Sequence, residues 1–501
     1  MSRAKCIMVQ GTMSGAGKSL LCAALCRIFA QDGYRVAPFK SQNMALNSFV
    51  TRDGLEMGRA QVVQAQAAGI EPDVRMNPIL LKPSSDVGSQ VIVNGEVRGQ
   101  MPAAAYFKLK KSLIPDILAA YDSLAEEVDI IVIEGAGSPA EINLKADDIV
   151  NMGLAKLVDA PVLLAGDIDR GGVFAQLYGT IALLEPQEQQ RIKGTIVNKF
   201  RGDRAILQPG IDILEKICGV PVAGVIPYTH VDIDDEDSLS TRFHTGNGRK
   251  DIDIAVVKLP RISNFTDVSP LERFESVSVR YIERPDQLHQ PDMILLPGTK
   301  STIADLLWLR QSGLEAAICQ QAARGCIVFG ICGGYQMMGQ EVLDPEHVEG
   351  DIERLPGLGL LPISTRMSGE KVTRQVKFGL CNPHSPSSTL RSPFMQGYEI
   401  HMGVTTPVEG APDSPLNLLE NGSTDGYYVD STCMGTYIHG ILDNPEFIDF
   451  LLAPFADKLS GNAGAFDYHT FKEEQYDRLA EHVRRHVNLP LIYQILTKNH
   501  D

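Results

Sequence analysis

Residues 8–19 read MVQGTMSGAGKS, in which an apolar run leads through a glycine-rich loop into a helical pattern. Such a loop turns backbone N–H groups and a helix N-terminus toward an anion, while Lys18 adds a positive charge and the Ser19 hydroxyl can reach Mg²⁺. Five residues separate Gly11 from Gly17, one more than the strict pattern allows, and Thr12 stands where the first glycine would fall. We predict a variant phosphate-binding loop rather than a glycine-rich turn without a ligand, because GKS directly begins the helix.

Short apolar runs alternate with helical patterns through the first 230 residues. The runs are AKCIMVQ (4–10), VDIIVIEGAG (128–137), APVLLAGDID (160–169), GTIVNKF (194–200) and VPVAGVIPY (220–228). Strands covered by helices on both faces of a parallel sheet read as continuous apolar runs. The pattern therefore predicts an α/β domain with a mostly parallel sheet over residues 1–230.

A second α/β series follows a charged stretch that begins with DIDDEDS (232–238). A polar, charged segment of this kind buries little surface, so we predict a linker over residues 231–250. The second series includes DIDIAVVKLP (251–260), SVSVRYIE (276–283) and GCIVFGICGGYQMM (325–338), and it predicts a second α/β domain over residues 251–447. The remainder, 448–501, reads as a C-terminal helical segment that docks onto the body.

Composition narrows the class of protein. The net charge of −16 over 501 residues argues against nucleic acid as a general partner, because such binders carry basic surfaces. The N-terminus has too short an apolar run for a signal peptide, and no stretch predicts a membrane span. Nine cysteines without regular spacing fit a reducing compartment. We expect a cytoplasmic protein.

Polar residues follow three of the apolar runs in the first domain. Glu134 ends VDIIVIE, a position from which a carboxylate reaches Mg²⁺ in this architecture, although an acid there is equally often structural. Asn198 ends GTIVN, where its amide can read a nucleobase edge or simply form a turn. GDIDRGG brings Asp167, Asp169 and Arg170 to a strand's carboxyl end, where ligands bind in parallel sheets, or forms an ordinary charged turn.

Residues 330–340, GICGGYQMMGQ, place Cys332 between an apolar strand and a helix with small residues on both sides. This is the pattern of a nucleophile elbow in which a thiol replaces the hydroxyl. A helix N-terminus lowers a thiol pKa through its dipole and N–H groups. A passive core thiol rarely needs glycines on both sides, so we predict that Cys332 is a nucleophile.

A thiol nucleophile needs a base, and the chain has eleven histidines. His439, in MGTYIHGIL, lies on an apolar run of the same predicted domain, and His401, in GYEIHMG, is the rival. A lone histidine on such a run is more often a hydrogen-bonded core residue. Backbone N–H groups near LPGTKST, at Gly298 and Thr299, together with that of Gly333, are candidates for an oxyanion hole.

The two motifs together resemble a known family. G-x-C-x-G-x-Q at 330–336 with a downstream histidine resembles the class I glutamine amidotransferases, and GTMSGAGKS resembles the dethiobiotin synthetase type of P-loop. That order of domains looks like the cobyrinic and cobyric acid amidases. Longer stretches that carry the resemblance are PFKSQNMALNSFVT (38–51), EMGRAQVVQAQAAG (56–69), NPILLKPSSDVGSQVIVNG (77–95), EGAGSPAEINL (134–144), GDIDRGGVFA (166–175) and LPRISNFTDVSPL (259–271).

The resemblance implies a P-loop domain followed by a class I glutaminase domain, with ATP and Mg²⁺ as cofactors and glutamine and a corrinoid as substrates. The implied reaction is amidation of the b, d, e and g carboxylates of an adenosylated corrinoid that already carries amides at a and c. Cys332 would be the glutaminase nucleophile and His439 its base. Many class I glutaminases place Glu two residues after the histidine, whereas this chain reads His439, Gly440, Ile441.

The loop pattern, the residues at the strand ends and the resemblance together give candidate site residues in the first domain, where Lys40, Asp53 and Glu56 are candidates for phosphate, metal or substrate contacts as a group. The expected ATP contacts are Gly11, Thr12, Gly15, Gly17, Lys18, Ser19, Asn198 and Lys199; the expected metal ligands are Ser19, Glu134 and Asp53; and the candidates for substrate contacts are Lys40, Glu56, Asp167, Asp169 and Arg170.

Two alternatives stay open from sequence. The first is the related enzyme that amidates the a and c carboxylates by the same chemistry, from which GDIDRGGVFA and KSQNMALNS distinguish this chain. The second is a P-loop regulatory ATPase with an inactive glutaminase-like domain, against which the presence of Cys332 and His439 argues. Sequence leaves the oligomeric state open.

Overall fold

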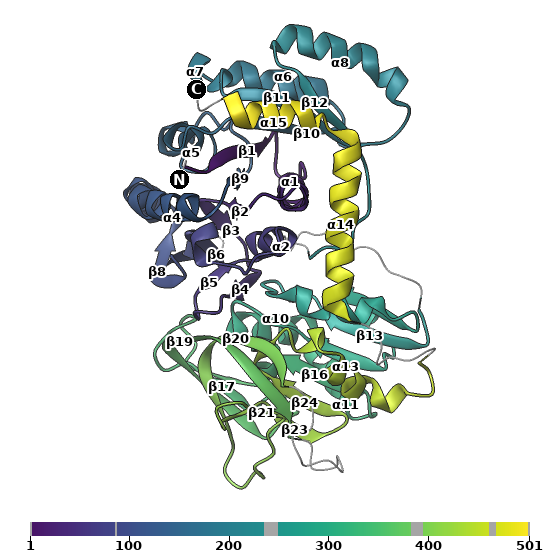
Figure 1. Cartoon of the computed structure of the whole chain (residues 1–501). Helices are drawn as coiled ribbons and strands as arrows, with labels where there is room; N and C mark the ends of the chain where they lie inside the picture. The colour runs from purple at the N-terminus through teal and green to yellow at the C-terminus, as the bar shows by residue number, and fades with distance from the viewer. Residues whose placement is uncertain (1–2, 86–87, 235–248, 382–393, 460–466, 499–501) are drawn as a thin grey trace. The chain divides into compact units, whose positions relative to one another are not determined.

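The computed structural model describes residues 3–85, 88–234, 249–381, 394–459 and 467–498 (Figure 1). Most of the predicted linker, residues 235–248, lies outside the described part. The chain forms two compact units. Unit 1 contains Met1–Met44, Met57–Asp234 and Thr470–Asp501, and unit 2 contains Ala45–Glu56 and Asp235–His469.

Unit 1 is built on a parallel sheet with the strand order β12-β11-β10-β1-β9-β2. Because the strands are parallel, their carboxyl ends meet at one edge, where the phosphate-binding loop and Glu134 lie. The strands are β1 (Lys5–Gly11), β2 (Val36–Phe39), β9 (Ile130–Glu134), β10 (Val162–Asp167), β11 (Ile192–Phe200) and β12 (Val222–Pro227).

Helices flank this sheet, and a smaller sheet extends the unit. The helices are α1 (Lys18–Gln31), α2 (Arg59–Ala67), α3 (Ala103–Leu109), α4 (Ile114–Glu127), α5 (Met152–Leu157), α6 (Val173–Leu183), α7 (Pro186–Gln189) and α8 (Arg204–Cys218). The smaller sheet has the order β3-β6-β7-β8, with β3 (Gln42–Met44), β6 (Ile79–Ser85), β7 (Gly88–Val93) and β8 (Glu96–Pro102).

The chain's last helices, α14 (Tyr468–His486) and α15 (Leu489–Lys498), complete the core of unit 1. Figure 1 shows α15, in yellow, beside the strands β10 to β12. The Asn488 N–H donates to the Ala223 carbonyl at 2.7 Å, and buried Tyr476, Leu479 and Ile492 pack with α1 and β1. The C-terminal segment therefore belongs to unit 1, which also contains the phosphate-binding loop.

Unit 2 contains two large sheets, and the short strand β4 lies outside both of them. One has the order β14-β13-β15-β16-β24-β23 and is parallel except for the β23–β24 pair. The other contains the path β18-β17-β19-β20-β25 and is dominated by the long antiparallel β19–β20 pair. The strands are β4 (Ser48–Val50), β13 (Ile252–Val257), β14 (Val277–Ile282), β15 (Met293–Leu296), β16 (Ile327–Ile331), β17 (Glu341–Leu343), β18 (Arg354–Pro356), β19 (Ile363–Leu380), β20 (Met395–Pro407), β21 (Asn417–Leu419), β22 (Thr424–Asp425), β23 (Tyr427–Asp430), β24 (Cys433–Thr436) and β25 (Ile438–His439).

The helices of unit 2 connect these strands and cover the first sheet. They are α9 (Pro285–Leu288), α10 (Thr302–Ser312), α11 (Leu314–Ala322), α12 (Gly333–Met337), α13 (Pro445–Leu452) and the 3-10 helix η5 (Phe265–Arg273). The α/β prediction is confirmed for both halves of the chain. In the described part of the chain, no helix has the length and apolar character needed to cross a membrane.

The units follow different bounds from the sequential domains expected from sequence. Residues 45–56 interrupt unit 1 in sequence and fold with unit 2, and strand β5 (Glu56–Gly58) contains the return point. Residues 470–501 rejoin unit 1 after the whole of unit 2 has been completed. Hydrophobic periodicity depends on local structure, so it does not reveal that a segment folds with a distant part of the chain.

Candidate active sites

The phosphate-binding loop joins β1 to α1, as the sequence predicts. Gly17 precedes α1 with a φ of 91°, a left-handed conformation that favours glycine. A Cβ at this position would also lie 2.2 Å from Asn198 Nδ2. The close approach and the positive φ both require glycine here, and the helix N-terminus is left facing the mouth of the loop.

Side chains from the neighbouring strand ends hold the loop in place. Asn198 Nδ2 donates to the Ala16 carbonyl at 2.9 Å, and Lys199 Nζ donates to the Gly15 carbonyl at 2.7 Å. The Thr12 N–H donates to the Ala165 carbonyl at 2.9 Å, and its hydroxyl donates to Gln176 at 3.1 Å. The first two bonds hold loop carbonyls and the last two hold Thr12, so anion binding is left to the other loop N–H groups and Lys18.

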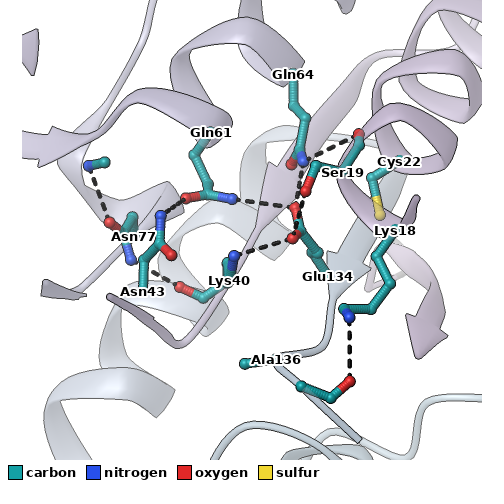
Figure 2. Close-up of polar contacts among 12 residues, drawn as sticks. Lys18, Ser19, Cys22, Lys40, Asn43, Gln61, Gln64, Asn77, Glu134 and Ala136 are labelled. Atoms are coloured by element: carbon teal, nitrogen blue, oxygen red, sulfur yellow. Dashed lines mark hydrogen bonds and ion pairs between the residues drawn. The ribbon is translucent and has the colours of Figure 1, made fainter. Parts of the chain in front are cut away.

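Lys18 is buried and lies across the loop. Its Nζ donates to the carbonyls of Met13 and Gly137, each at 3.0 Å (Figure 2 draws the second of these bonds). The ammonium is therefore held at the carboxyl ends of β1 and β9, next to the helix N-terminus. A positive charge at that point complements a bound polyphosphate.

Glu134 is the centre of a buried polar cluster (Figure 2). Its Oε1 accepts from Lys40 Nζ and from the Ser19 hydroxyl, each at 2.9 Å. Its Oε2 accepts from the side-chain amides of Gln64 and Gln61. Gln61 in turn accepts from Asn43 Nδ2 at 3.1 Å through its own Oε1.

The pKa of Glu134 is lowered, so the carboxylate is ionised at neutral pH. Burial alone would raise this pKa, but Lys40, Gln64 and Lys18 favour the charged form and outweigh it. The donors around this buried carboxylate keep it in its charged form. Removing one partner of such a pair costs about 3–5 kcal/mol.

The donor set fits a magnesium ion bound with nucleotide. The Ser19 hydroxyl and the Glu134 carboxylate provide neighbouring oxygen ligands, which Mg²⁺ prefers, and it takes its remaining ligands from water and phosphate. Among the described residues, no group of three or more His, Cys, Asp or Glu side chains could hold a metal by itself.

The other residues predicted for this site are dispersed. Asp167 is buried and pairs with Lys199 at 2.8 Å, which places it at the loop. Asp169 pairs with Arg201 at 3.2 Å, and both Asp169 and Arg170 are exposed. Their roles toward substrate stay predictions.

Asp53 and Glu56 belong to unit 2, whereas Glu134 belongs to unit 1. Asp53 is exposed. Glu56 is buried and forms an ion pair with Lys371 of β19. The predicted metal role of Asp53 and substrate role of Glu56 stay predictions.

Cys332 in unit 2 occupies a sharp turn between β16 and α12. Its φ of 52° and ψ of −112° are an unfavourable combination for a non-glycine residue. A Cβ on Gly334 would lie 2.0 Å from the Leu296 carbonyl, and one on Gly330 would lie 2.8 Å from the Tyr335 backbone. The glycines therefore allow the strand and helix to pack closely around a strained cysteine, the geometry of a nucleophile elbow.

His439 and Asp267 form a buried pair beside this turn. His439 Nδ1 lies 2.6 Å from Asp267 Oδ2, and the Gly440 N–H donates to Asp267 Oδ1 at 2.9 Å. A carboxylate only accepts, so Nδ1 carries the proton and Nε2 is left for Cys332. Burial lowers the pKa of His439, but the Asp267 carboxylate and the hydrogen bond with Cys332 outweigh this effect. The pKa is therefore raised from 6.5 to about 10. The three side chains form a triad-like arrangement.

The predicted oxyanion residues gather at the same turn. A Cβ on Gly298 would lie 3.0 Å from His439 Cε1, and one on Gly333 would lie 3.2 Å from the Thr299 backbone N. The Thr299 hydroxyl donates to Asp305 at 2.5 Å and accepts from the Ser301 N–H at 3.1 Å, which fixes the turn. The structure thus brings Gly298, Thr299 and Gly333 together with the base.

His401, the rival base, has different surroundings. Its Nδ1 lies 3.2 Å from the Gly403 carbonyl, and its ring stacks on Tyr437 with centroids 3.7 Å apart. Burial lowers the pKa of His401 to about 3, so it stays neutral. The carboxylate partner of His439 favours His439 as the base.

Comparison with known proteins matches both halves of the chain. Residues 7–239 match the CobQ/CobB/MinD/ParA nucleotide binding domain, and residues 253–447 match the CobB/CobQ-like glutamine amidotransferase domain. The cobyric acid synthase of Bacteroides fragilis is 55% identical over 98% of both chains. The cobyric acid synthase of Lachnoclostridium phytofermentans is 56% identical over 98% of this chain and 99% of its own. The chain belongs to the cobyric acid synthase family.

As a member of the cobyric acid synthase family, the chain is a glutamine-dependent ligase with a nucleotide-binding domain. A more distant relative, the cobyric acid synthase of Streptococcus sanguinis, is still 50% identical over 99% of both chains. The relationship therefore spans the nucleotide and glutaminase halves in a single polypeptide.

Asp267 is the member of the Cys332–His439–Asp267 arrangement that sequence reasoning missed. It lies in LPRISNFTDVSPL, a stretch that carries the family resemblance, but 172 positions before His439. The missing glutamate after His439 left open whether another group orients the imidazole or the glutaminase is slow without one. Nothing in the spacing could have selected Asp267 among the chain's 62 acidic residues.

Proposed function

We propose that the protein uses ATP and glutamine to amidate the b, d, e and g carboxylates of adenosylcobyrinic acid a,c-diamide, forming adenosylcobyric acid. The observation that carries the proposal is the Cys332–His439–Asp267 arrangement in a chain whose other unit holds the phosphate loop and Glu134. Family membership over nearly the full length supports the choice of substrate.

In the glutaminase half, the Cys332 thiolate attacks the side-chain amide carbon of glutamine. Backbone N–H groups at Thr299 and Gly333 stabilise the oxyanion of the tetrahedral intermediate. His439 gives its Nε2 proton to the departing ammonia, and Asp267 holds the ring throughout. A water molecule, deprotonated by His439, then hydrolyses the thioester and releases glutamate.

In the ATP half, a corrinoid carboxylate takes the γ-phosphoryl group of ATP to form an acyl phosphate and ADP. Lys18 and the loop N–H groups stabilise the transferred charge, and Ser19 and Glu134 would hold Mg²⁺, which supplies further positive charge at the phosphates. Ammonia attacks the acyl carbon, and phosphate leaves. Each amidation thus consumes one ATP and one nitrogen.

The test is the product mass distribution when purified protein receives ATP, Mg²⁺, the a,c-diamide corrinoid and either glutamine or ammonium. The wild type should give a series ending at four acid-to-amide conversions with either nitrogen source. Cys332→Ser should lose the reaction with glutamine and keep the reaction with ammonium. Cys319→Ser, a thiol-to-hydroxyl change at a half-buried position of unit 2, is the matched control.

Two outcomes would contradict the proposal. Amidation of a corrinoid that lacks all amides, with no conversion of the a,c-diamide, would assign the chain to the a,c-amidating enzymes. Inertness toward both corrinoids, with ATP hydrolysis retained, would favour a regulatory ATPase.

A further inference from the structure

The base His439 stacks on a tyrosine held by residues from far upstream. Tyr398 and His439 are direct partners in the antiparallel β20–β25 pair. Their rings are stacked, with centroids 5.4 Å apart and an interplanar angle of 23°. Both side chains are buried, so the tyrosine ring forms one wall of the imidazole's site.

The hydroxyl of Tyr398 is held by a closed hydrogen-bond circuit. It donates to the Ser48 carbonyl at 3.2 Å and accepts from Asn264 Nδ2 at 3.3 Å. The Ser48 N–H donates to Asn264 Oδ1 at 3.0 Å, which closes the circuit. All three residues are buried, so water does not compete with these bonds.

The circuit also reaches Asp267. Asn264 precedes η5 in a left-handed conformation with a φ of 51°, and Asp267 lies in the first turn of that 3-10 helix. The Asp267 N–H donates to the Asn264 carbonyl at 3.0 Å. The same asparagine therefore fixes the helix that carries the carboxylate and the tyrosine that stacks on the imidazole.

The segment that supplies Ser48 is anchored to unit 2 along its length. Phe49 packs edge-on against Tyr398 with centroids 5.1 Å apart. Gln375 Nε2 donates to the Val50 carbonyl, and Lys371 forms an ion pair with Glu56. This segment, residues 45–56, belongs to the sequence range of the nucleotide-binding domain.

We propose that Tyr398 is a positioning residue for the base, and that residues 45–56 serve as its scaffold. Asp267 holds Nδ1 of the imidazole but leaves the ring free to tilt about that bond. The stacked tyrosine restricts the tilt and keeps Nε2 directed at Cys332. The inference rests on the proposed function only in taking His439 as the glutaminase base.

The test is steady-state glutamine hydrolysis by full-length Tyr398→Phe, which keeps the ring and removes the hydroxyl. We expect kcat to fall about five- to tenfold, because the variant loses both buried hydrogen bonds of the hydroxyl, with KM for glutamine changed less than twofold. Ammonium-dependent amidation should stay at the wild-type rate. Lys371→Met, which releases Glu56 of the scaffold and does not touch the base, should lower kcat in the same direction by a smaller factor.

Tyr427→Phe is the matched control, because this buried tyrosine of unit 2 also donates to a carbonyl, that of Pro412 at 2.7 Å. A wild-type kcat in Tyr398→Phe would overturn the proposal, as would a raised KM at constant kcat or an equal loss in Tyr427→Phe. Failure of the wild type to amidate with ammonium would instead contradict the proposed function, while glutamine hydrolysis would still decide the role of Tyr398.

Discussion

The Glu134 cluster and the Cys332 site differ in whether their charges are fixed or can change by proton transfer. Around Glu134, lysine, serine and two glutamines all donate to one carboxylate and hold its charge fixed. Around Cys332, the imidazole of His439 sits between a thiol and the Asp267 carboxylate, so a proton can move. The first arrangement suits phosphoryl transfer, in which charge must be stabilised, and the second suits acyl transfer, in which protons must be delivered.

The largest effect should come from removing the fixed charge. Glu134→Gln should lower amidation at least about 1000-fold with either glutamine or ammonium, because a neutral amide neither binds Mg²⁺ well nor balances Lys40. Glutamine hydrolysis measured without corrinoid should persist. Product masses and glutamate release in the same samples check both statements.

Glu188→Gln is the control for that variant, since Glu188 is equally buried and pairs with Lys145 and Lys156 in unit 1. If Glu188→Gln lost amidation to the same extent, general destabilisation would explain the result and the special role of Glu134 would be wrong.

Asp267→Asn should affect only the proton-moving site. We expect kcat for glutamine hydrolysis to fall at least about 100-fold, because the neutral amide no longer stabilises the imidazolium that protonates the departing ammonia. Ammonium-dependent amidation should be unchanged. Asp344→Asn, at another fully buried aspartate of unit 2 that accepts from backbone N–H groups, should retain glutamine hydrolysis.

Ser19→Ala should have a smaller effect, confined to the metal requirement of the first site. Loss of one oxygen ligand should raise the Mg²⁺ concentration for half-maximal amidation about tenfold. A Mg²⁺ titration at saturating ATP measures it. An unchanged midpoint would exclude Ser19 as a ligand.

The ion pair at the Cys332 site should also make stability depend on pH. The pKa of His439 is raised from 6.5 to about 10 in the folded state, so its stabilising contribution is complete below pH 6.5 and lost as pH rises through about 10. Denaturant unfolding across this window should show a fall in the free energy of unfolding that is weaker in Asp267→Asn. Parallel profiles for the two proteins would contradict the assigned ion pair.

The strands of both units and the turns at the two candidate sites could be predicted from short stretches of sequence. The continuous apolar runs identified the parallel strands of both units, and the glycines around Lys18 and Cys332 identified their turns, because each signal lies within a few consecutive residues. Glu134 and Asn198 were found for the same reason, since strand ends of a parallel sheet share an edge.

Long-range pairing was not predictable. Asp267, Tyr398 and Ser48 meet around His439 only because η5, β20 and residues 45–56 converge there, and no periodicity encodes that convergence. The ion pair of Glu56 with Lys371 likewise joins positions 315 apart. Contacts of this kind depend on tertiary packing, which a single sequence does not display.

The exchange of residues 45–56 means that the coding sequence of each unit is interrupted by that of the other. Because that segment folds with unit 2 while its flanks fold with unit 1, no single break in the coding sequence yields two complete proteins. A fragment beginning at residue 249 would carry Cys332, His439 and Asp267 but not Ser48 or Phe49. A gene split at the linker would thus encode a glutaminase fragment in which Tyr398, which stacks on His439, lacks the contacts of residues 45–56. The fold therefore favours keeping both units in one polypeptide.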